Sequence, residues 1–215
     1  MAGFIIRHAA ILTIFLSAGI SLIRAQPYDD GGLSALLIEQ CAPPCWRGIQ
    51  PGITTGSEAL ALVEQLQYTR DLGSNLGAFF GQIYWRWPQD AGFKLNPDTH
   101  ELAYVWLEKD VVRKVFLPGF RAFGDVSLVM GRPERVAIYT DSTFNASYAV
   151  YLAIYPGDFY LASLLACDAN THDLWNAQAN VHIGARPDYV SAQAREYSAA
   201  ELRGWMPARL CRRRS

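Results

Sequence analysis

The strongest folding signals of this chain lie together in one stretch, Cys41-Ala-Pro-Pro-Cys45-Trp46-Arg-Gly-Ile-Gln-Pro-Gly52-Ile-Thr54-Thr55. Two cysteines enclose a proline pair, and the stretch leads into Thr55-Gly-Ser-Glu58, which fits a capping box at the start of a helix. The apolar positions that follow repeat at helical spacing: Ala59, Leu62, Val63 and Leu66. The sequence therefore predicts that the folded part begins here, with a helix whose apolar face joins the core.

An apolar segment at the N-terminus precedes this stretch. It contains Arg7, then an uncharged run from Ala9 to Ile23, and ends in Ile-Arg-Ala25, which fits a cleavage site. This layout is typical of a secretory signal peptide over residues 1–25. An uncleaved membrane anchor is the alternative, but a spanning helix needs about 20 apolar residues and this run is shorter. Lipid attachment is not expected, because Cys41 follows Ile-Glu-Gln rather than small residues. We expect a secreted or periplasmic protein, with membrane contact only through an uncleaved signal.

The charge of the chain argues against a nucleic-acid partner. The formal net charge is −1, and removal of residues 1–25, which hold two arginines and no acid, makes it −3. A weakly acidic protein has no electrostatic reason to bind nucleic acid. The basic cluster of Arg209 and the tail 212–215 is typical of a solvated terminus, with anionic lipid or an acidic polymer as the alternative partner.

Four cysteines lie in the exported part, and an even number in an oxidising compartment indicates disulfides. Three pairings are possible. We favour Cys41 with Cys45, because a turn through Pro43 and Pro44 can bring them within bonding distance, and this leaves Cys167 with Cys211. A zinc site does not fit the spacing, which offers no Cys-x-x-Cys pair. These four residues are the only site residues that we predict, with no cofactor.

Three strands are predicted after the first helix. Ile83, Trp85 and Trp87 alternate with Tyr84 and Arg86 up to Pro88, as in a half-buried strand. Residues 102–107 and 111–117 flank Glu108-Lys109-Asp110 and predict a hairpin. The segment 71–81 contains three glycines, so we expect a loop there.

The same order of elements recurs in the second half. Phe123–Met130 predicts a short helix with Asp125 near its start, ended by Gly131 and Pro133. Strand candidates follow at 136–139, 147–155 and 159–166, the last two joined by a Pro-Gly-Asp turn. Beyond Cys167 we expect a loop rich in Asn, His and Asp, a short apolar segment at 181–183 and a final helix near 198–204.

The predicted fold class is therefore α+β, with two tandem helix-then-antiparallel-sheet units, each a short helix packed on about three strands. The expected division is a signal peptide over 1–25, a lead-in segment over 26–40, a first unit over 41–120, a second unit over 121–211 and a basic tail over 212–215.

The run Cys45 to Thr55, with Phe-Gly-Asp125-Val and Gly131-Arg-Pro-Glu-Arg-Val136 further on, resembles a group of uncharacterised exported bacterial proteins. The framing of each helix also resembles, more weakly, the small lipoprotein of the outer-membrane barrel-assembly machinery and the β-lactamase-inhibitor fold. Both are helix-then-sheet modules that bind other proteins and carry no active site. The resemblance thus implies a fold and a binding role, although this chain lacks the lipidated cysteine.

Catalytic motifs are missing from the sequence. It has no Gly-x-Ser-x-Gly elbow, no His-Glu-x-x-His, no phosphate loop and no dinucleotide fingerprint, so we do not expect an enzyme. One cluster could hold a divalent metal and support a hydrolase: Asp168, His172, Asp173 and His182. A polar surface loop explains the same residues more simply.

Aromatic residues on the predicted strands offer a second function. They are Tyr84, Trp85, Trp87, Tyr104, Trp106, Tyr148, Tyr151 and Tyr155. Exposed rings aligned across a sheet would bind a sugar or a protein partner, and inward rings would be core. We expect Trp85, Trp87 and Trp106 to be core, and the three later tyrosines remain open, with Tyr151 and Tyr155 on one face.

Two functions remain after these exclusions. The first is a secreted, non-catalytic module that binds protein, another envelope protein for example, or is structural in the cell envelope. The second is a glycan or small-ligand binder that uses exposed sheet aromatics. A contiguous row of open tyrosines or tryptophans would favour the second, and buried rings with a flat apolar edge would favour the first.

Overall fold

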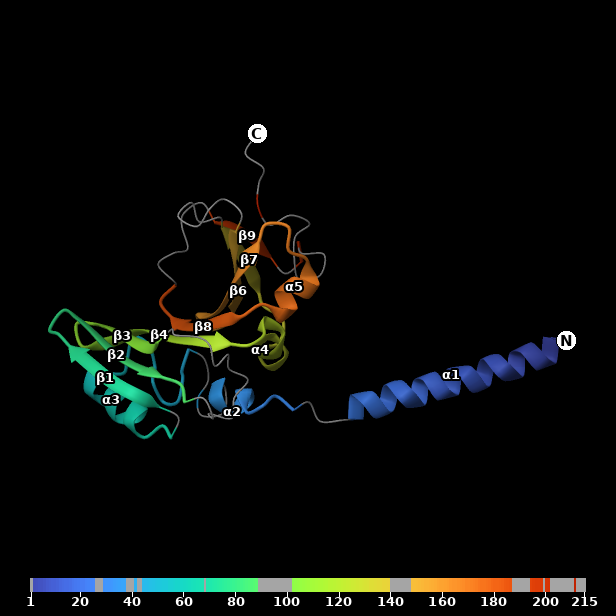
Figure 1. Cartoon of the computed structure of the whole chain (residues 1–215), viewed down its shortest axis with the longest axis horizontal. Coiled ribbons are helices and arrows are strands. Elements are labelled where there is room, and N and C mark those ends of the chain that lie inside the picture. Colours follow the sequence, from blue (N-terminus) through green and yellow to red (C-terminus); the bar gives the residue numbers. More distant parts are fainter. Residues whose placement is uncertain are drawn as a thin grey trace.

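The computed structural model places most of the chain. The residues that it describes are 2–25, 29–37, 41, 44–67, 69–88, 102–139, 148–186, 194–198, 200–201 and 211. They form an α+β fold in which one antiparallel sheet carries short helices on one of its faces (Figure 1).

Nine strands of the described chain form this sheet, and every neighbouring pair is antiparallel. Their order across the sheet is β1-β2-β3-β4-β8-β7-β6-β5-β9. The strands are β1 Arg70–Leu76, β2 Phe80–Arg86, β3 Ala103–Glu108, β4 Val111–Phe120, β5 Arg135–Tyr139, β6 Tyr148–Tyr155, β7 Phe159–Ala166, β8 Ala179–Gly184 and β9 Arg195–Ser198. Figure 1 shows that the sheet bends near β8, with β1–β4 on one side of the bend and β5–β7 on the other.

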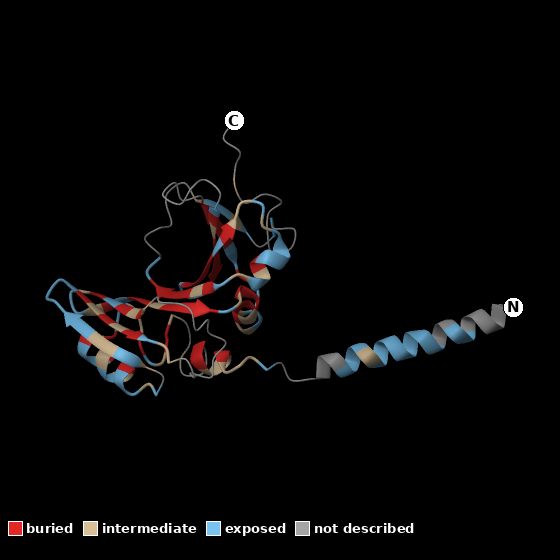
Figure 2. Ribbon diagram, in the orientation of Figure 1, coloured by how far each residue is buried: buried red, intermediate tan, exposed pale blue. Residues whose placement is uncertain are grey.

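The described residues also form five helices. They are α1 Ala2–Ala25, α2 Leu33–Leu37, α3 Gly56–Glu64, α4 Phe123–Met130 and α5 Thr171–Asn176. The last four contribute buried side chains to one core cluster, which includes the inward residues of the strands. Figure 2 shows that the buried residues, in red, are concentrated along the central strands.

The helix predicted after the two-cysteine stretch is confirmed as α3. The side-chain oxygen of Thr55 accepts a hydrogen bond from the backbone N–H of Glu58, and the Glu58 carboxylate accepts the backbone N–H of Thr55 at 2.9 Å. These bonds to the backbone and hydroxyl of Thr55 lower the pKa of Glu58. Ala59 and Val63 are buried, so the apolar face of the helix packs on the sheet as expected.

Trp46 connects the two-cysteine stretch to the core. Its indole stacks on Trp85 of β2, with ring centroids 5.6 Å apart and planes 8° apart. Its Nε1 donates a hydrogen bond to the carbonyl of Leu36 at 2.9 Å. Leu36 belongs to α2, whose leucines are buried, so the core extends into the segment 26–40 that was expected to be a lead-in.

The expectation of a loop over 71–81 is wrong, because residues 70–76 form β1. Gly73 suggested a loop, but in the sheet it makes room for a ring: a Cβ at this position would lie 2.5 Å from the side chain of Tyr84 on β2. Glycine in a strand often marks such a close approach. The turn to β2 is short and ends at Phe80.

Both predicted hairpins are confirmed. β3 and β4 are joined at Lys109 and Asp110, whose φ angles of 51° and 60° fit a two-residue type I′ turn. β6 and β7 are joined at Gly157 and Asp158, and they pair from Tyr155 opposite Phe159 outward along both strands. The helix predicted over Phe123–Met130 and the strand over 136–139 are confirmed as α4 and β5.

Two expectations for the C-terminal part are wrong. The polar segment after Cys167 contains helix α5 rather than only a loop, because a capping box starts a helix there. The side chain of Asn170 accepts the backbone N–H of Asp173, and the Asp173 carboxylate accepts the backbone N–H of Asn170. Residues 195–198 form β9, so no helix begins at Ser198, and residues 202–204 lie outside the described residues. The basic tail 212–215 also lies outside them.

The sheet is continuous across the boundary expected at residue 120. β8 comes from the C-terminal part, whose pairing the sequence left open, and it lies between β4 and β7. Val115 and Leu161 flank this strand, opposite Ile183 and Val181 respectively. One sheet therefore spans both halves, and two separate units are not evident in it.

Helix α1 covers the segment read as a signal peptide. Figure 2 shows it extending away from the sheet, and nearly all of its described side chains are exposed. Among the described residues, no helix combines the length and the apolar character that crossing a membrane requires.

Candidate functional site

The two faces of the sheet differ in what covers them. Residues such as Ile83, Val105 and Val115 face the helices and belong to the main core. Their chain neighbours point to the opposite face, on which none of the described helices packs, and we call it the helix-free face. A second small apolar cluster lies there on β5–β7: Ala137, Leu152, Ile154, Tyr160 and Ala162. The candidate site is on the other side of the bend, on β2–β4.

An aromatic row crosses the helix-free face. Its members are directly opposite one another on five neighbouring strands: Tyr84, Tyr104, Phe116, His182 and Tyr160. The ring of Phe116 lies 4.8 Å from that of Tyr104 and 4.8 Å from that of His182, measured between centroids. Such distances are within the range of favourable ring contacts. The row therefore forms a packed layer of rings, buried or only partly exposed, at the base of the site.

The exposed part of the site lies beside this row. Trp106 on β3 is 39% exposed and Phe80 on β2 is 62% exposed, with ring centroids 6.0 Å apart. The expectation that Trp106 is core is wrong, because its neighbours Val105 and Leu107 are the inward residues of β3. Trp85 is buried and Trp87 packs against its ring edge-on, as expected of core residues.

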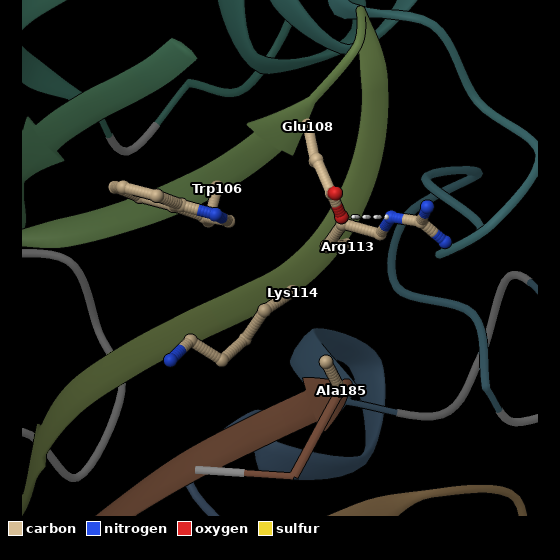
Figure 3. Close-up of a pocket in the computed structure, with 5 residues that line it drawn as sticks. All are labelled: Trp106, Glu108, Arg113, Lys114 and Ala185. Carbon is tan, nitrogen blue, oxygen red and sulfur yellow. Dashed lines mark hydrogen bonds and ion pairs between the residues drawn. The ribbon is translucent and has the colours of Figure 1, made fainter. Parts of the chain in front are cut away.

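A hollow of about 320 Å³ adjoins Trp106. Its lining residues are Trp106, Glu108, Arg113, Lys114 and Ala185 (Figure 3). Figure 3 shows that the Arg113 Nε reaches the Glu108 carboxylate, at 3.0 Å, while Trp106 and Lys114 extend from the neighbouring strands β3 and β4. We call Phe80 together with these lining residues the Trp106 platform.

Charges at the platform differ in their exposure. Arg113 and Glu108 are partly exposed, whereas Lys114 is only 8% exposed and its ammonium lies 5.8 Å from the centre of the Tyr104 ring. A cation over an aromatic face is attracted by the ring quadrupole. The platform thus combines an apolar surface with an ion pair at its rim.

His182 is a buried member of the row. It is 1% exposed, and burial, together with the positive charge of Lys114, lowers its pKa to about 3. Burial likewise raises the pKa of Tyr160 to about 12, with a smaller contribution from Asp158. His182 is therefore neutral at physiological pH and acts as a packed ring.

The possible metal cluster does not come together. His182 lies on the helix-free face, whereas His172 and Asp173 belong to α5, which packs on the opposite face through Leu174. His172 is 85% exposed at its side chain and lies 3.9 Å from Asp173. No group of three or more potential metal ligands is found among the residues that the structure places.

The cysteines pair as favoured from the sequence. Cys41 bonds to Cys45, with Cα atoms 5.6 Å apart, and Cys167 bonds to Cys211, with Cα atoms 5.1 Å apart. The first bond closes the turn that leads into Trp46, and the second ties the end of β7 to the C-terminal segment. They act as structural crosslinks.

The three tyrosines left open by the sequence separate into two groups. Tyr151 and Tyr155 share the helix-bearing face and are buried, where the hydroxyl of Tyr155 lies 3.3 Å from that of Ser127. Burial raises the pKa of Tyr155 to about 12 and raises that of Tyr151 as well. Tyr148 is exposed on the helix-free face at the far end of β6.

Several platform residues were missed from the sequence. Phe80 was not singled out, because it falls within the loop that we expected over 71–81. Arg113 and Lys114 were not singled out, because charged residues close to a hairpin turn are usually only solvated. The alternation of Val105, Trp106 and Leu107 was the available signal, since two aliphatic residues around an aromatic one indicate which face is core.

Comparisons with protein-family models, curated proteins and solved structures find no match to this chain.

Proposed function

We propose that this chain is an extracytoplasmic, non-catalytic module that binds another protein of the cell envelope through the Trp106 platform. The observation that carries the proposal is the exposed pair Phe80 and Trp106, mounted on a rigid sheet beside the Arg113–Glu108 ion pair. Aromatic side chains and arginine are enriched at the energetic centres of protein interfaces.

The arrangement of the rings supports protein over sugar as the partner. A sugar platform would need a contiguous row of open rings, but His182 and Tyr160 are buried and Tyr84, Tyr104 and Phe116 are only partly exposed. An exposed apolar group instead lies at one end of the helix-free face: Phe80 and Trp106, with Phe79 in the turn that precedes β2. An apolar patch with a polar rim is typical of a protein-binding surface.

The extracytoplasmic location rests on the N-terminal segment and the disulfides. Stable disulfides form in oxidising compartments, and both bonds of this chain link cysteines of the exported part. The apolar helix α1 extends away from the sheet, which suits a segment that is removed on export (Figure 1). The same proposal includes the resemblance to exported helix-then-sheet binding modules. It also includes the division into units over 41–120 and 121–211.

A glycan is the second candidate ligand. The hollow beside Trp106 is favourable for it, because an indole face lies next to a carboxylate and a guanidinium that can bond hydroxyl groups. The first proposal also includes a purely structural role in the cell envelope, in which the module binds no soluble ligand.

Affinity capture tests the protein-binding proposal. The exported protein is used as bait in its own envelope extract, together with Trp106→Ala and with Leu128→Ala, which removes an exposed side chain from α4 on the opposite face. We expect a protein that co-purifies with the wild type and with Leu128→Ala but not with Trp106→Ala. Equal recovery by all three baits would exclude the platform as the contact surface.

A glycan array distinguishes the second candidate. Binding of an oligosaccharide by the wild type, with loss of binding in Trp106→Ala, would replace protein by glycan as the ligand of the platform. No array signal above that of Trp106→Ala would leave the protein as the ligand.

A further inference from the structure

The two edges of the sheet are protected to different degrees. β9 forms one edge; it is four residues long, and its Glu196 is held by Arg135 and by Arg186. β1 forms the other edge, and no strand of the described chain pairs with its outer side. Short length and charged side chains commonly prevent an edge strand from pairing with another chain. β1 is longer than β9, and its charged residues, Arg70 and Asp71, lie only at its start.

The sequence of β1 suits pairing. From Leu72 to its end at Leu76 it contains neither charge nor proline, and Ser74, Asn75 and Leu76 are exposed. A bulge between Arg70 and Gly73 confines the irregular part to the start of the strand. A regular, uncharged edge therefore remains over Gly73–Leu76 and offers backbone N–H and C=O groups to another strand.

We propose that two copies of this chain pair edge to edge through β1, antiparallel and with the two-fold axis at Ser74. In this register Leu72 of one copy lies opposite Leu76 of the second copy. Leu72 packs against the main core, while Leu76 is 45% exposed beside the start of α3. Pairing covers Leu76 and extends the helix-bearing core from one copy into the next.

The register itself favours a second copy as the occupant, because it sets the apolar Leu72 and Leu76 of the two copies opposite each other. The charged residues Arg70 and Asp71 fall opposite Ala78 and Gly77 of the second copy, so no like charges meet across the contact. A symmetric contact also covers the β1 edge of each copy at once. The proposal does not depend on the protein-binding function, because Trp106 lies on β3 of the helix-free face and not on this edge.

Charged substitutions at the two-fold axis give a specific test. Residues directly opposite in an antiparallel pair have Cβ atoms about 5 Å apart, and like charges there are destabilising. Ser74→Lys places two ammonium groups together, and Ser74→Asp places two carboxylates together. An equal mixture of the two variants instead brings a lysine opposite an aspartate.

Sedimentation velocity of the exported protein over a range of concentrations reads out the result. We expect the wild type to form a dimer, each single variant to weaken it at least about tenfold, and the mixture to restore it. Ser198→Lys, which adds the same charge at the β9 edge, should leave the dimer intact. A wild type that stays monomeric, that associates only with another protein, or whose dimer survives both Ser74 variants would overturn the proposal.

Discussion

Gly124 lies in the first turn of α4, against the indole of Trp175. A Cβ built at this position would be 2.2 Å from a ring carbon of Trp175 and 3.0 Å from its backbone oxygen. Alanine is normally the better helix former by about 1 kcal/mol. The close packing of α4 on α5 reverses that preference here.

Gly124→Ala should therefore destabilise the protein by about 1–3 kcal/mol, the usual cost of overpacking a filled core. Urea unfolding measures the change in the free energy of unfolding. In a Trp175→Leu background the same substitution should cost less, because the ring that it strikes has been removed. A stabilising effect of Gly124→Ala in the wild type would contradict the packing described here.

His182 makes the stability of the fold depend on pH. Its neighbours are Lys114 and Phe116 on β4 and Tyr160 on β7, and its pKa is lowered to about 3. The unfolded chain binds a proton near pH 6.5 and the folded chain does not, so the free energy of unfolding falls as the pH drops from about 6.5 toward 3. The slope from this one group reaches about 1.4 kcal/mol per pH unit.

His182→Gln should remove that part of the pH dependence. Urea unfolding at several values between about pH 7 and pH 4 gives the slope for wild type and variant. His172→Gln, at the exposed start of α5, is the matched histidine control. If wild type and His182→Gln lose stability in parallel, His182 is not buried as a neutral ring.

At the scale of elements, the two disulfides close loops of very different length. Cys41 and Cys45 are separated by 4 positions in the sequence, whereas Cys167 and Cys211 are separated by 44. In the chain-entropy model a crosslink stabilises more when the loop that it closes is longer, by about 2 kcal/mol for the short loop and about 4 kcal/mol for the long one.

Replacing Cys167 and Cys211 together by serine should thus cost more stability than replacing Cys41 and Cys45 together. Guanidinium unfolding of both double variants compares them directly. The short bond has its own consequence, since it leads into Trp46. Its loss should change the near-ultraviolet dichroism of the Trp46–Trp85 stack. A larger loss of stability from the short bond would show that packing at Trp46 outweighs chain entropy.

The elements with local signals were predictable from the sequence. The capping box of α3, the glycine stop of α4 and the two hairpin turns each have a short-range physical cause, and all four are found in the structure. β1 and α5 were missed for the opposite reason. The glycine of β1 is explained only by the ring of Tyr84 across the sheet, and the Asn170 cap of α5 lies in a polar segment that also fits a loop.

The candidate site was only partly predictable. Aromatic residues on both faces of β2 and β3 led to the wrong expectation that Trp106 is core, and its partners on β4 and β8 come from distant parts of the sequence. Long-range pairing of Phe116 with His182 creates the row, and no local pattern indicates it. The disulfide pairing, in contrast, followed from the prolines between Cys41 and Cys45.

At the scale of the whole molecule, a single bent sheet separates two tasks. One face is filled by helices, disulfide-anchored segments and stacked tryptophans, and it provides stability. The other presents Phe80 and Trp106 at one end of the sheet, next to a charged rim. The protein is therefore proposed to act as a rigid support that displays a binding surface.

Photocrosslinking in the living cell tests this account most directly. A photoreactive phenylalanine analogue is placed at position 80, in place of Phe80 on the platform, and in a separate strain at position 128, in place of Leu128 on α4. We predict a crosslinked protein adduct from position 80 and none from position 128. The absence of a protein adduct at position 80, or equal adducts at both positions, would contradict a binding surface at the Trp106 platform.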